Sequence, residues 1–387
     1  MTNRERILAA LNYEPYDYLP ILHFGFLGET LDRWRKEGHL NEQEYNEARC
    51  GDGDVRLEPL TKRLGFDLAY HRVFSPNTRI APGFETKVIE VLPDGSQKIQ
   101  TGHGVIILQR QGATGIPMEF DHILKGRKEW EELFVPRLQF SMDRVTGAWV
   151  NCETDMKPFD QGGLEYLKQP NREDHYLIHC GSLYGAIRDY VGMENLCYLI
   201  ADDIDLVIEM IDVCAELCYQ CAKATLETGA LFDIGHLWED ICYRSGPLVN
   251  PKFFAEHVGP HYRRITELLA SYGINLVSLD CDGMIDALVP IWLENGVNVM
   301  FPIEVGTWGA SIANWREKYG KQALGVGGMR KHVLAQDYAA IDEEVERLVR
   351  LVDLGGFIPC PDHRIADDAV WENVQYYTDA LRKALNR

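Results

Sequence analysis

The chain has 387 residues, of which 46% are hydrophobic, and it carries a formal net charge of −20 at neutral pH. This length and composition allow a large buried core, in one large α/β domain or in two ordinary ones. The negative charge argues against nucleic acid or an anionic membrane as a partner, because both need Lys and Arg to neutralise phosphate.

Neither a secretory signal nor a membrane span is predicted. The N-terminal segment carries Arg4 and Arg6 but lacks the apolar stretch and small-residue cleavage site of a signal peptide, and its pattern is that of an amphipathic surface helix. Cys214, Cys218 and Cys221 recur at helical spacing, which favours buried thiols on one helix face over a three-thiol metal site. Ten cysteines without regular spacing indicate a reducing compartment, so we expect a cytoplasmic protein.

Apolar runs that alternate with helical patterns predict a parallel sheet built from βαβ units. In chain order, the expected strands are residues 18–26, 66–74, 176–183, 231–240, 274–283, 297–305, 322–330 and 355–364. Eight strands is the number that closes a (β/α)8 barrel, so we expect an α/β TIM barrel that takes residues 1–387 as one domain. A doubly wound sheet ranks second, because no G-x-G-x-x-G motif follows a strand.

Residues 87–124 interrupt this alternation. Apolar and polar residues alternate there on both sides of a Pro-Asp-Gly triplet at 93–95, which is a hairpin signal. We expect an antiparallel hairpin insertion after the second strand, lying over the barrel mouth. Its polar side chains face either substrate or, as is commoner on a hairpin, solvent; they are His103, Glu119, Asp121 and His122.

The carboxyl ends of four expected strands carry ionisable side chains. Active sites of parallel barrels form at this end, which makes these residues candidates for chemistry. Any single carboxylate among them could instead cap the following helix, but a thiol, an imidazole and several carboxylates on one face of a barrel favour a site. The candidates are His236, Glu239 and Asp240; Asp280, Cys281 and Asp282; Glu304; and Cys360, Asp362 and His363.

A metal site is expected among these residues. Asp280 and Asp282 are two positions apart and point to the same side of their strand, whereas Cys281 points to the other side. We expect Asp280 and Cys360 to share one metal, with donor atoms within about 4 Å of each other. A thiolate argues against Mg²⁺ or Ca²⁺ and favours Zn²⁺. Glu239 is placed as the third ligand, with Asp282 as the alternative; the one that does not bind would orient a ligand.

Four segments of the chain resemble the uroporphyrinogen decarboxylase superfamily. They are the opening T-N-R-E-R-I-L-A-A-L-N-Y-E-P-Y-D-Y-L-P-I, the segment H-C-G-S-L-Y-G-A-I-R-D-Y-V-G-M-E-N-L, and the strand ends at Asp280–Gly283 and Gly355–His363. The resemblance runs over nearly the whole chain and implies a (β/α)8 barrel, in agreement with the strand count. The superfamily includes porphyrinogen decarboxylases and zinc-dependent methyltransferases that work with corrinoid proteins.

Individual residues distinguish these branches. The decarboxylases carry paired arginines near the N-terminal strand, and the matching residues 22–28 contain none. The corrinoid-linked thiol methyltransferases have a His-x-Cys pair and a distant Cys. Asp280 stands at their His, Asp282 at their first Cys and Cys360 at their second, so two oxygen donors replace ligands and argue against a thiol substrate. The Asp-x-Asp-Gly motif and the Ile-Pro-x-Pro-Asp-His ending resemble the branch that includes O-demethylases of methyl ethers.

The resemblance therefore implies a zinc-dependent methyltransferase. It would move the methyl group of a methyl ether, preferably a methoxylated aromatic, to the Co(I) of a corrinoid carried by a separate protein. A Lewis acid would stabilise the charge on the leaving oxygen. His363 would protonate or hydrogen-bond that oxygen, or orient a metal ligand, and Asp282 is the second catalytic candidate. The methyl donor, the corrinoid protein and the oligomeric state, a homodimer included, stay open.

An aromatic substrate needs an apolar wall, and six aromatic residues lie at or near expected strand ends. Most of them are expected to be core residues, and we assign substrate contact to Phe24, Tyr184 and Trp238, with His236 as a polar neighbour. The six are Phe24, Phe26, Tyr184, Trp238, Phe301 and Trp308.

Three other functions remain as alternatives. The first is a metal-independent decarboxylase of an unidentified carboxylic acid, which would use Asp and His side chains. The second is methyl transfer from another donor, such as a methylated thiol or amine. The third is a non-catalytic barrel that binds a small molecule or a partner, because one fold hosts unrelated activities.

Overall fold

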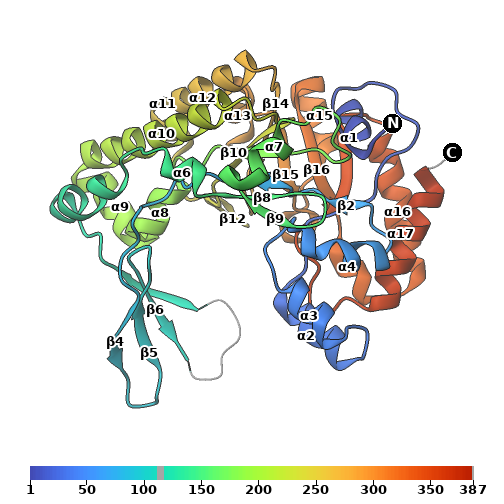
Figure 1. Cartoon of the computed structure of the whole chain (residues 1–387), viewed down its shortest axis with the longest axis horizontal. Helices are drawn as coiled ribbons and strands as arrows, with labels where there is room; N and C mark the ends of the chain where they lie inside the picture. Colours follow the sequence, from blue (N-terminus) through green and yellow to red (C-terminus); the bar gives the residue numbers. More distant parts are fainter. Residues whose placement is uncertain (111–116, 386–387) are drawn as a thin grey trace.

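The computed structural model describes residues 1–110 and 117–385. All the expected parallel strands are present and form a barrel, which confirms the predicted α/β (β/α)8 fold (Figure 1). One sheet of seven strands makes most of the wall, in the order β3 (Val73–Phe74), β10 (Leu177–His179), β11 (Ile234–Trp238), β14 (Leu276–Asp280), β15 (Val299–Ile303), β16 (Leu324–Met329) and β17 (Phe357–Pro361).

The remaining part of the wall is made by two short strands. β1 (Leu22–His23) pairs in parallel with β2 (Leu68–Ala69). The expected second strand is therefore split, since its first half pairs with β1 and its second half, β3, pairs with β10. A parallel bridge between Phe26 and Ile365 joins the segment after the first barrel strand, β1, to the segment after the last, β17, and closes the barrel.

Helices follow the strands and cover the outside of the barrel, as the alternating pattern predicts (Figure 1). In chain order they are α1 (Asn3–Leu11), α2 (Gly28–Lys36), α3 (Glu42–Ala48), α4 (Glu58–Arg63), α8 (Gly185–Val191), α9 (Met193–Asp202), α10 (Ile204–Glu227), α11 (Pro251–His257), α12 (Gly259–Ser271), α13 (Val289–Glu294), α14 (Val305–Trp308), α15 (Ile312–Tyr319), α16 (Tyr338–Val352) and α17 (Trp371–Leu385).

Short elements fill the connections. They are the single turns η1 (Val55–Leu57), α5 (Arg127–Glu129), η2 (Trp130–Phe134), η3 (Val135–Arg137), α6 (Asp143–Thr146), η4 (Phe159–Gly163), α7 (Leu164–Leu167), η5 (Gly320–Gln322) and η6 (Lys331–Ala335), and the antiparallel pairs β8 (Trp149–Asn151) with β9 (Met156–Pro158) and β12 (Cys242–Tyr243) with β13 (Gly246–Pro247). Within α10, Cys214, Cys218 and Cys221 are buried free thiols, as expected for an apolar helix stripe.

The core has two layers that follow the alternation of side chains along each strand. On β14, Leu276 belongs to the apolar cluster inside the barrel. Val277, Leu279 and Cys281 belong to the larger cluster between the strands and the helices. Asp280, four positions after Leu276, therefore points into the barrel, and Cys281 points away from it.

The interrupting segment forms an antiparallel sheet of four strands, β4 (Lys87–Val91), β5 (Gln97–Gln100), β6 (Val105–Gln109) and β7 (Met118–His122). The turn at 93–95 forms as predicted, and the positive φ of Gly95 closes it. The sheet leaves the barrel after the carboxyl end of β3 and extends away from the body of the molecule, so most of it does not lie over the mouth (Figure 1). Residues 111–116 of the predicted insertion lie outside the described residues.

In the part of the chain that the structure describes, none of the helices combines the length and the apolar character that crossing a bilayer requires.

Candidate functional site

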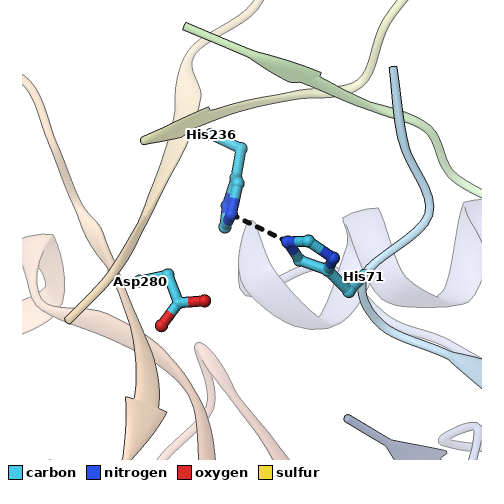
Figure 2. Close-up of side chains that lie close together, drawn as sticks. All are labelled: His71, His236 and Asp280. Atoms are coloured by element: carbon cyan, nitrogen blue, oxygen red, sulfur yellow. Dashed lines mark hydrogen bonds between the residues drawn. The ribbon is translucent and has the colours of Figure 1, made fainter. Parts of the chain in front are cut away.

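Two imidazoles and a carboxylate converge inside the barrel at the carboxyl ends of its strands (Figure 2). His236 lies on β11, Asp280 ends the neighbouring β14, and His71 follows β2. The Nε2 atoms of His71 and His236 are 3.1 Å apart. One potential ligand atom from each of the three residues lies within 4.8 Å of the other two.

Hydrogen bonds on the far side of each ring hold the two imidazoles in this orientation. His236 Nδ1 is 3.1 Å from the hydroxyl of Ser278, and the backbone of Asp52 bonds the ring of His71. Burial lowers the pKa of His71 to about 4, with the charge of Arg364 adding to the effect. Burial also holds the pKa of His236 well below its ordinary value. Both rings are therefore neutral near pH 7, which is the form that binds metals.

A second group of potential ligands shares Asp280 and adds Asp240 and Asp282. Asp240 has a φ of 49° and accepts a hydrogen bond of 3.0 Å from the amide of Asp282, which holds the two loops together. Burial and the nearby Asp282 raise the pKa of Asp240 to about 6. Burial, reinforced by Asp240, raises the pKa of Asp280 well above its ordinary value. The three carboxyl groups thus concentrate negative charge at one point, where a cation or bound protons must offset it.

The donor set fits a zinc ion. Two ligands at about 2.05 Å in tetrahedral geometry lie about 3.3 Å apart, close to the separation of the two Nε2 atoms. Hydrogen bonds to the outer nitrogens are the usual support for histidine ligands. In addition, Oδ1 of Asp282 is buried, and among the described residues it has no hydrogen-bond partner. His71, His236 and Asp280 could therefore hold the metal, with Asp240 and Asp282 beside them.

His363 lies beside this group on the loop that follows β17. Its Nε2 is 3.4 Å from Oδ2 of Asp282. The ring of Phe24 packs against it at 5.4 Å in an edge arrangement, and Phe24 also lies 6.0 Å from the ring of His71. The structure thus brings together two predicted catalytic residues, His363 and Asp282, and one predicted aromatic contact, Phe24.

Other carboxylates at the strand ends hold the loops in place. Glu304 accepts from the amide of Gly283 and from the hydroxyl of Thr307. Asp362 accepts from the amides of Gly306 and Lys331 at 2.7 and 3.2 Å. These are structural roles, of the kind that acidic residues at strand ends commonly have.

A partly exposed ion pair closes the site on the side of β1. Arg364 donates from Nε to Oδ2 of Asp52 at 2.9 Å. Asp52 lies against Gly25, where an added Cβ would meet Oδ1 of Asp52 at 2.1 Å. Only glycine leaves room for the carboxylate at this point. Arg364 also interacts electrostatically with Asp280 and Asp282.

The structure corrects the predicted role of Cys360. Among the described residues, Cys360 belongs to neither group of potential ligands. Its side chain is fully buried in the apolar cluster inside the barrel, together with Phe24, Tyr70 and Phe301. Burial raises the pKa of its thiol well above the ordinary value, which disfavours the thiolate that would bind a metal. Asp280 and Cys360 are therefore not brought together as a shared metal site.

Glu239 is also placed differently from the prediction. It is fully buried and accepts hydrogen bonds from the amides of Leu183, Tyr184 and Gly185 and from the hydroxyls of Ser182 and Tyr262. These amides open α8, so the carboxylate caps the helix and complements its dipole. With both oxygens engaged, Glu239 supports the fold rather than a metal.

Tyr184, which was predicted to contact substrate, lies on the helix side of the barrel wall. Tyr184 lies in the outer apolar cluster, with its ring 6.3 Å from that of Phe254. Phe26 belongs to the same outer cluster, and Trp308 packs against that cluster beside Trp315. These side chains are on the helix side of the barrel wall, away from the metal-ligand group.

Trp238 and His236, both predicted as substrate-binding residues, lie on β11, and one residue of the potential ligand group was missed. Trp238 is two positions after His236 on β11, so both side chains point to the same side of the wall. Phe301 adds an apolar neighbour, with its ring 6.3 Å from those of His71 and His236. His71 was not among the predicted site residues, although an imidazole that follows the largely apolar residues 68–70 is the same signal that identified the other strand ends.

The chain belongs to the uroporphyrinogen decarboxylase (URO-D) family. The family model matches residues 186–384, slightly more than half of the 387 residues. This span begins in α8 and includes every barrel strand from β11 to β17. His236, Asp280, Asp282 and His363 lie within it, and His71 lies outside it.

A solved structure shares the fold. A methyltransferase from Methanosarcina mazei has 17% sequence identity to the chain, covers 99% of both chains and superposes with a TM-score of 0.59. A B12-independent methionine synthase from a Shewanella species, in complex with selenomethionine, has 12% identity, covers 95% of this chain and 97% of its own, and has a TM-score of 0.47. No curated protein matches the chain.

Proposed function

We propose that the chain is a zinc-dependent methyltransferase that moves the methyl group of a methoxylated aromatic to the Co(I) of a corrinoid carried by a separate protein. The observation that carries this proposal is the convergence of His71, His236 and Asp280 at the barrel mouth, where two neutral imidazoles face one buried carboxylate. The resemblance of the strand ends to the O-demethylase branch and the fold shared with a methyltransferase support it.

His71, His236 and Asp280 would hold the zinc ion, which would supply Lewis acidity at the ether oxygen. Ser278 and the backbone of Asp52 would keep the two imidazoles in the tautomers that leave both Nε2 atoms free. This arrangement replaces the predicted set of Glu239, Asp280 and Cys360 and keeps only Asp280 from it.

The leaving oxygen needs a proton, and His363 is placed to give it. Its Nε2 faces Asp282, whose carboxylate would orient the ring. Phe24 packs against the same ring and limits its motion. A corrinoid protein docked over the mouth would also exclude water from the ether, which strengthens each of these electrostatic contacts.

Methyl transfer to free cob(I)alamin tests the proposal without the unidentified corrinoid protein. The purified protein should contain about one zinc per chain and should form methylcobalamin from methoxybenzene or a substituted relative, as followed by absorbance. His71→Ala and His236→Ala should each lose the metal and at least about 100-fold in rate. His39→Ala, a substitution near the surface and distant in sequence from the site, is the matched control and should lose neither. Full activity after chelation of all metal would refute the proposal.

A decarboxylase is the second candidate, and one observation favours it. The pKa of Asp240 is raised to about 6, so this carboxyl can carry a proton near neutral pH and deliver it to a carbanion. Release of carbon dioxide from a carboxylic acid substrate without any corrinoid, together with no methyl transfer to cob(I)alamin, would establish this function instead.

A further inference from the structure

Two free thiols meet beside the second group of potential ligands, on loops that follow neighbouring strands of the barrel. Cys242 begins β12, in the connection after β11, and Cys281 is the first residue after β14. Both are free cysteines. The thiol of Cys281 forms a hydrogen bond with that of Cys242, so the two sulfur atoms are in contact.

The backbones of the two loops hold the thiols together. The amide of Met284 donates to the carbonyl of Tyr243 at 2.8 Å. Gly283 has a φ of 87°, and a Cβ at this position would meet the carbonyl oxygen of Cys242 at 2.5 Å. Only glycine allows the loops to approach this closely. The contact between the two thiols is therefore fixed by the backbone of both loops.

The two thiols differ in their access to solvent. Cys242 is half-buried, so a small oxidant can reach its sulfur. Cys281 is buried, and its sulfur lies 3.6 Å from the carbonyl oxygen of Asp282. An accessible thiol beside a second one is the arrangement in which a sulfenic acid formed on the first is captured by the second as a disulfide.

We propose that Cys242 and Cys281 form an oxidisable dithiol that closes into a disulfide and thereby lowers the metal affinity of the site. Hydrogen peroxide would transfer one oxygen to the sulfur of Cys242, which gives a sulfenic acid and one water. The sulfur of Cys281 would then attack the sulfur of Cys242. The S–S bond forms, the S–O bond breaks, and the leaving hydroxide takes the proton of the Cys281 thiol as a second water. The two thiols lose two electrons, which the peroxide takes up.

The disulfide would act on the metal site through the loops that it joins. Cys281 lies between Asp280 and Asp282, and Cys242 is two positions after Asp240, so the cross-link ties the segments that carry the second group of potential ligands. A disulfide bond of about 2.05 Å is much shorter than the distance between two thiols in contact, so the loops must move when it forms. Metal–ligand distances tolerate shifts of only about 0.2 Å. Oxidation should therefore weaken zinc binding, and reduction should restore it.

Mass spectrometry and chelator competition on the zinc-loaded protein test this inference, which rests on the proposed zinc site. Stoichiometric hydrogen peroxide should link the peptides that contain Cys242 and Cys281. The cross-linked protein should bind zinc at least about 10-fold more weakly, with recovery after dithiothreitol. His71, His236 and Asp280 contain no sulfur, so oxidation of a ligand does not explain such a loss. Absence of the cross-link, or unchanged affinity in the cross-linked protein, would overturn the inference.

Substitutions assign the response to this pair of thiols. Cys242→Ser changes a half-buried side chain by one atom, so the fold should be kept. Its zinc affinity should not respond to peroxide, and Cys281→Ala should be equally insensitive. Cys197→Ser is the control, because Cys197 is an exposed free cysteine on α9, and this variant should keep both the cross-link and the response. A response to peroxide that persists in Cys242→Ser would refute the assignment.

The two proposals fail differently. A protein that forms the cross-link but holds no zinc and transfers no methyl group refutes the proposed function, and the disulfide site stands. A zinc-loaded protein that methylates cob(I)alamin but forms no cross-link with peroxide keeps the proposed function and refutes the dithiol.

Discussion

The Nε2 atoms of His71 and His236 face each other at 3.1 Å, although 165 positions separate the two residues in the chain. In a metal-free protein, one of these atoms must carry the proton that the other accepts. A metal shared by both Nε2 atoms needs that proton on Nδ1 of the same ring instead, because a neutral imidazole keeps one N–H when it binds a metal. Since both rings are neutral near pH 7, metal binding to this pair changes a tautomer there and releases no proton; the affinity should fall only at a pH low enough to protonate the rings.

Removing the thiol of Cys360 should leave the metal in place. Cys360→Ala is expected to keep about one zinc per chain and to reduce stability modestly, by about 1–2 kcal/mol, because the side chain packs only as a small apolar group inside the barrel. Asp280→Asn should lose most of the zinc. Metal analysis by mass spectrometry separates the two, and loss of zinc from Cys360→Ala would restore the predicted thiolate ligand.

Ser278→Ala should weaken metal binding without removing a ligand. Its hydroxyl bonds the outer nitrogen of His236, and loss of such support costs about 10- to 100-fold in metal affinity. Competition with a zinc chelator measures the change. Ser271→Ala removes a hydroxyl that bonds only its own helix backbone and should leave the affinity unchanged.

Glu239→Ala should destabilise the fold rather than the metal site alone. The substitution leaves three amides at the start of α8 and the hydroxyl of Tyr262 buried without their acceptor. The expected cost is about 3–5 kcal/mol of unfolding free energy, measured by urea denaturation. The exposed Glu294→Ala serves as the control, with a change below about 0.5 kcal/mol. Normal stability with loss of zinc would contradict the capping role.

Stability should fall on acidification, and His23 should account for part of the loss. Burial lowers the pKa of His23 from 6.5 to about 3. The unfolded chain therefore binds a proton on His23 before the folded chain does. The stabilising contribution is complete above pH 6.5 and is lost progressively as the pH falls toward 3, by about 1.4 kcal/mol per pH unit.

The variant His23→Gln isolates this contribution. Glutamine can keep the hydrogen bond to Thr61, 2.9 Å long in the native protein, and has no charge to gain. Its unfolding free energy should depend less steeply on pH between 6 and 4 than that of the native protein. Identical slopes for His23→Gln and the native protein would contradict the prediction.

His363→Asn should lower kcat while the zinc content stays at about one per chain. His363 belongs to neither group of potential ligands among the described residues, and it faces Asp282. Loss of a proton donor typically costs about 10²–10⁴-fold in rate. The loss should shrink for ethers whose leaving oxygen is less basic, because these need less protonation. A uniform loss across such ethers would indicate a positioning role instead.

The fold could be predicted from the sequence because each strand is a distinct apolar run and the count of eight closes a barrel. Part of the site followed from the same signal, since Asp280 and Asp282 come directly at a strand end. The alternation of side chains along β11 could have corrected the prediction that Glu239 is a metal ligand. Glu239 is an odd number of positions from His236 and therefore points to the opposite side of the wall.

The place of Cys360 could not be predicted in this way. Its strand and its inward orientation are as expected, but the large rings of Phe24, Tyr70 and Phe301 fill the barrel around it. These rings come from three other strands of the barrel. Their packing depends on side-chain volumes in three dimensions, which the pattern of residues along the sequence does not show. The role of His71 likewise depends on how the backbone turns at that residue, between β2 and β3, the two halves of the expected second strand.

His71, His236 and Asp280, which converge on the mouth, come from the second, fourth and fifth strands of the barrel. No single supersecondary unit contains them, so the cluster exists only when the wall between β2 and β14 is assembled. A ligand that binds all three residues therefore binds only the folded barrel. By linkage, such a ligand stabilises the folded state by about 2.7 kcal/mol at a free concentration 100 times its Kd. The Tm of this protein should thus rise with the metal occupancy of the site, and thermal denaturation can serve as an assay of that occupancy.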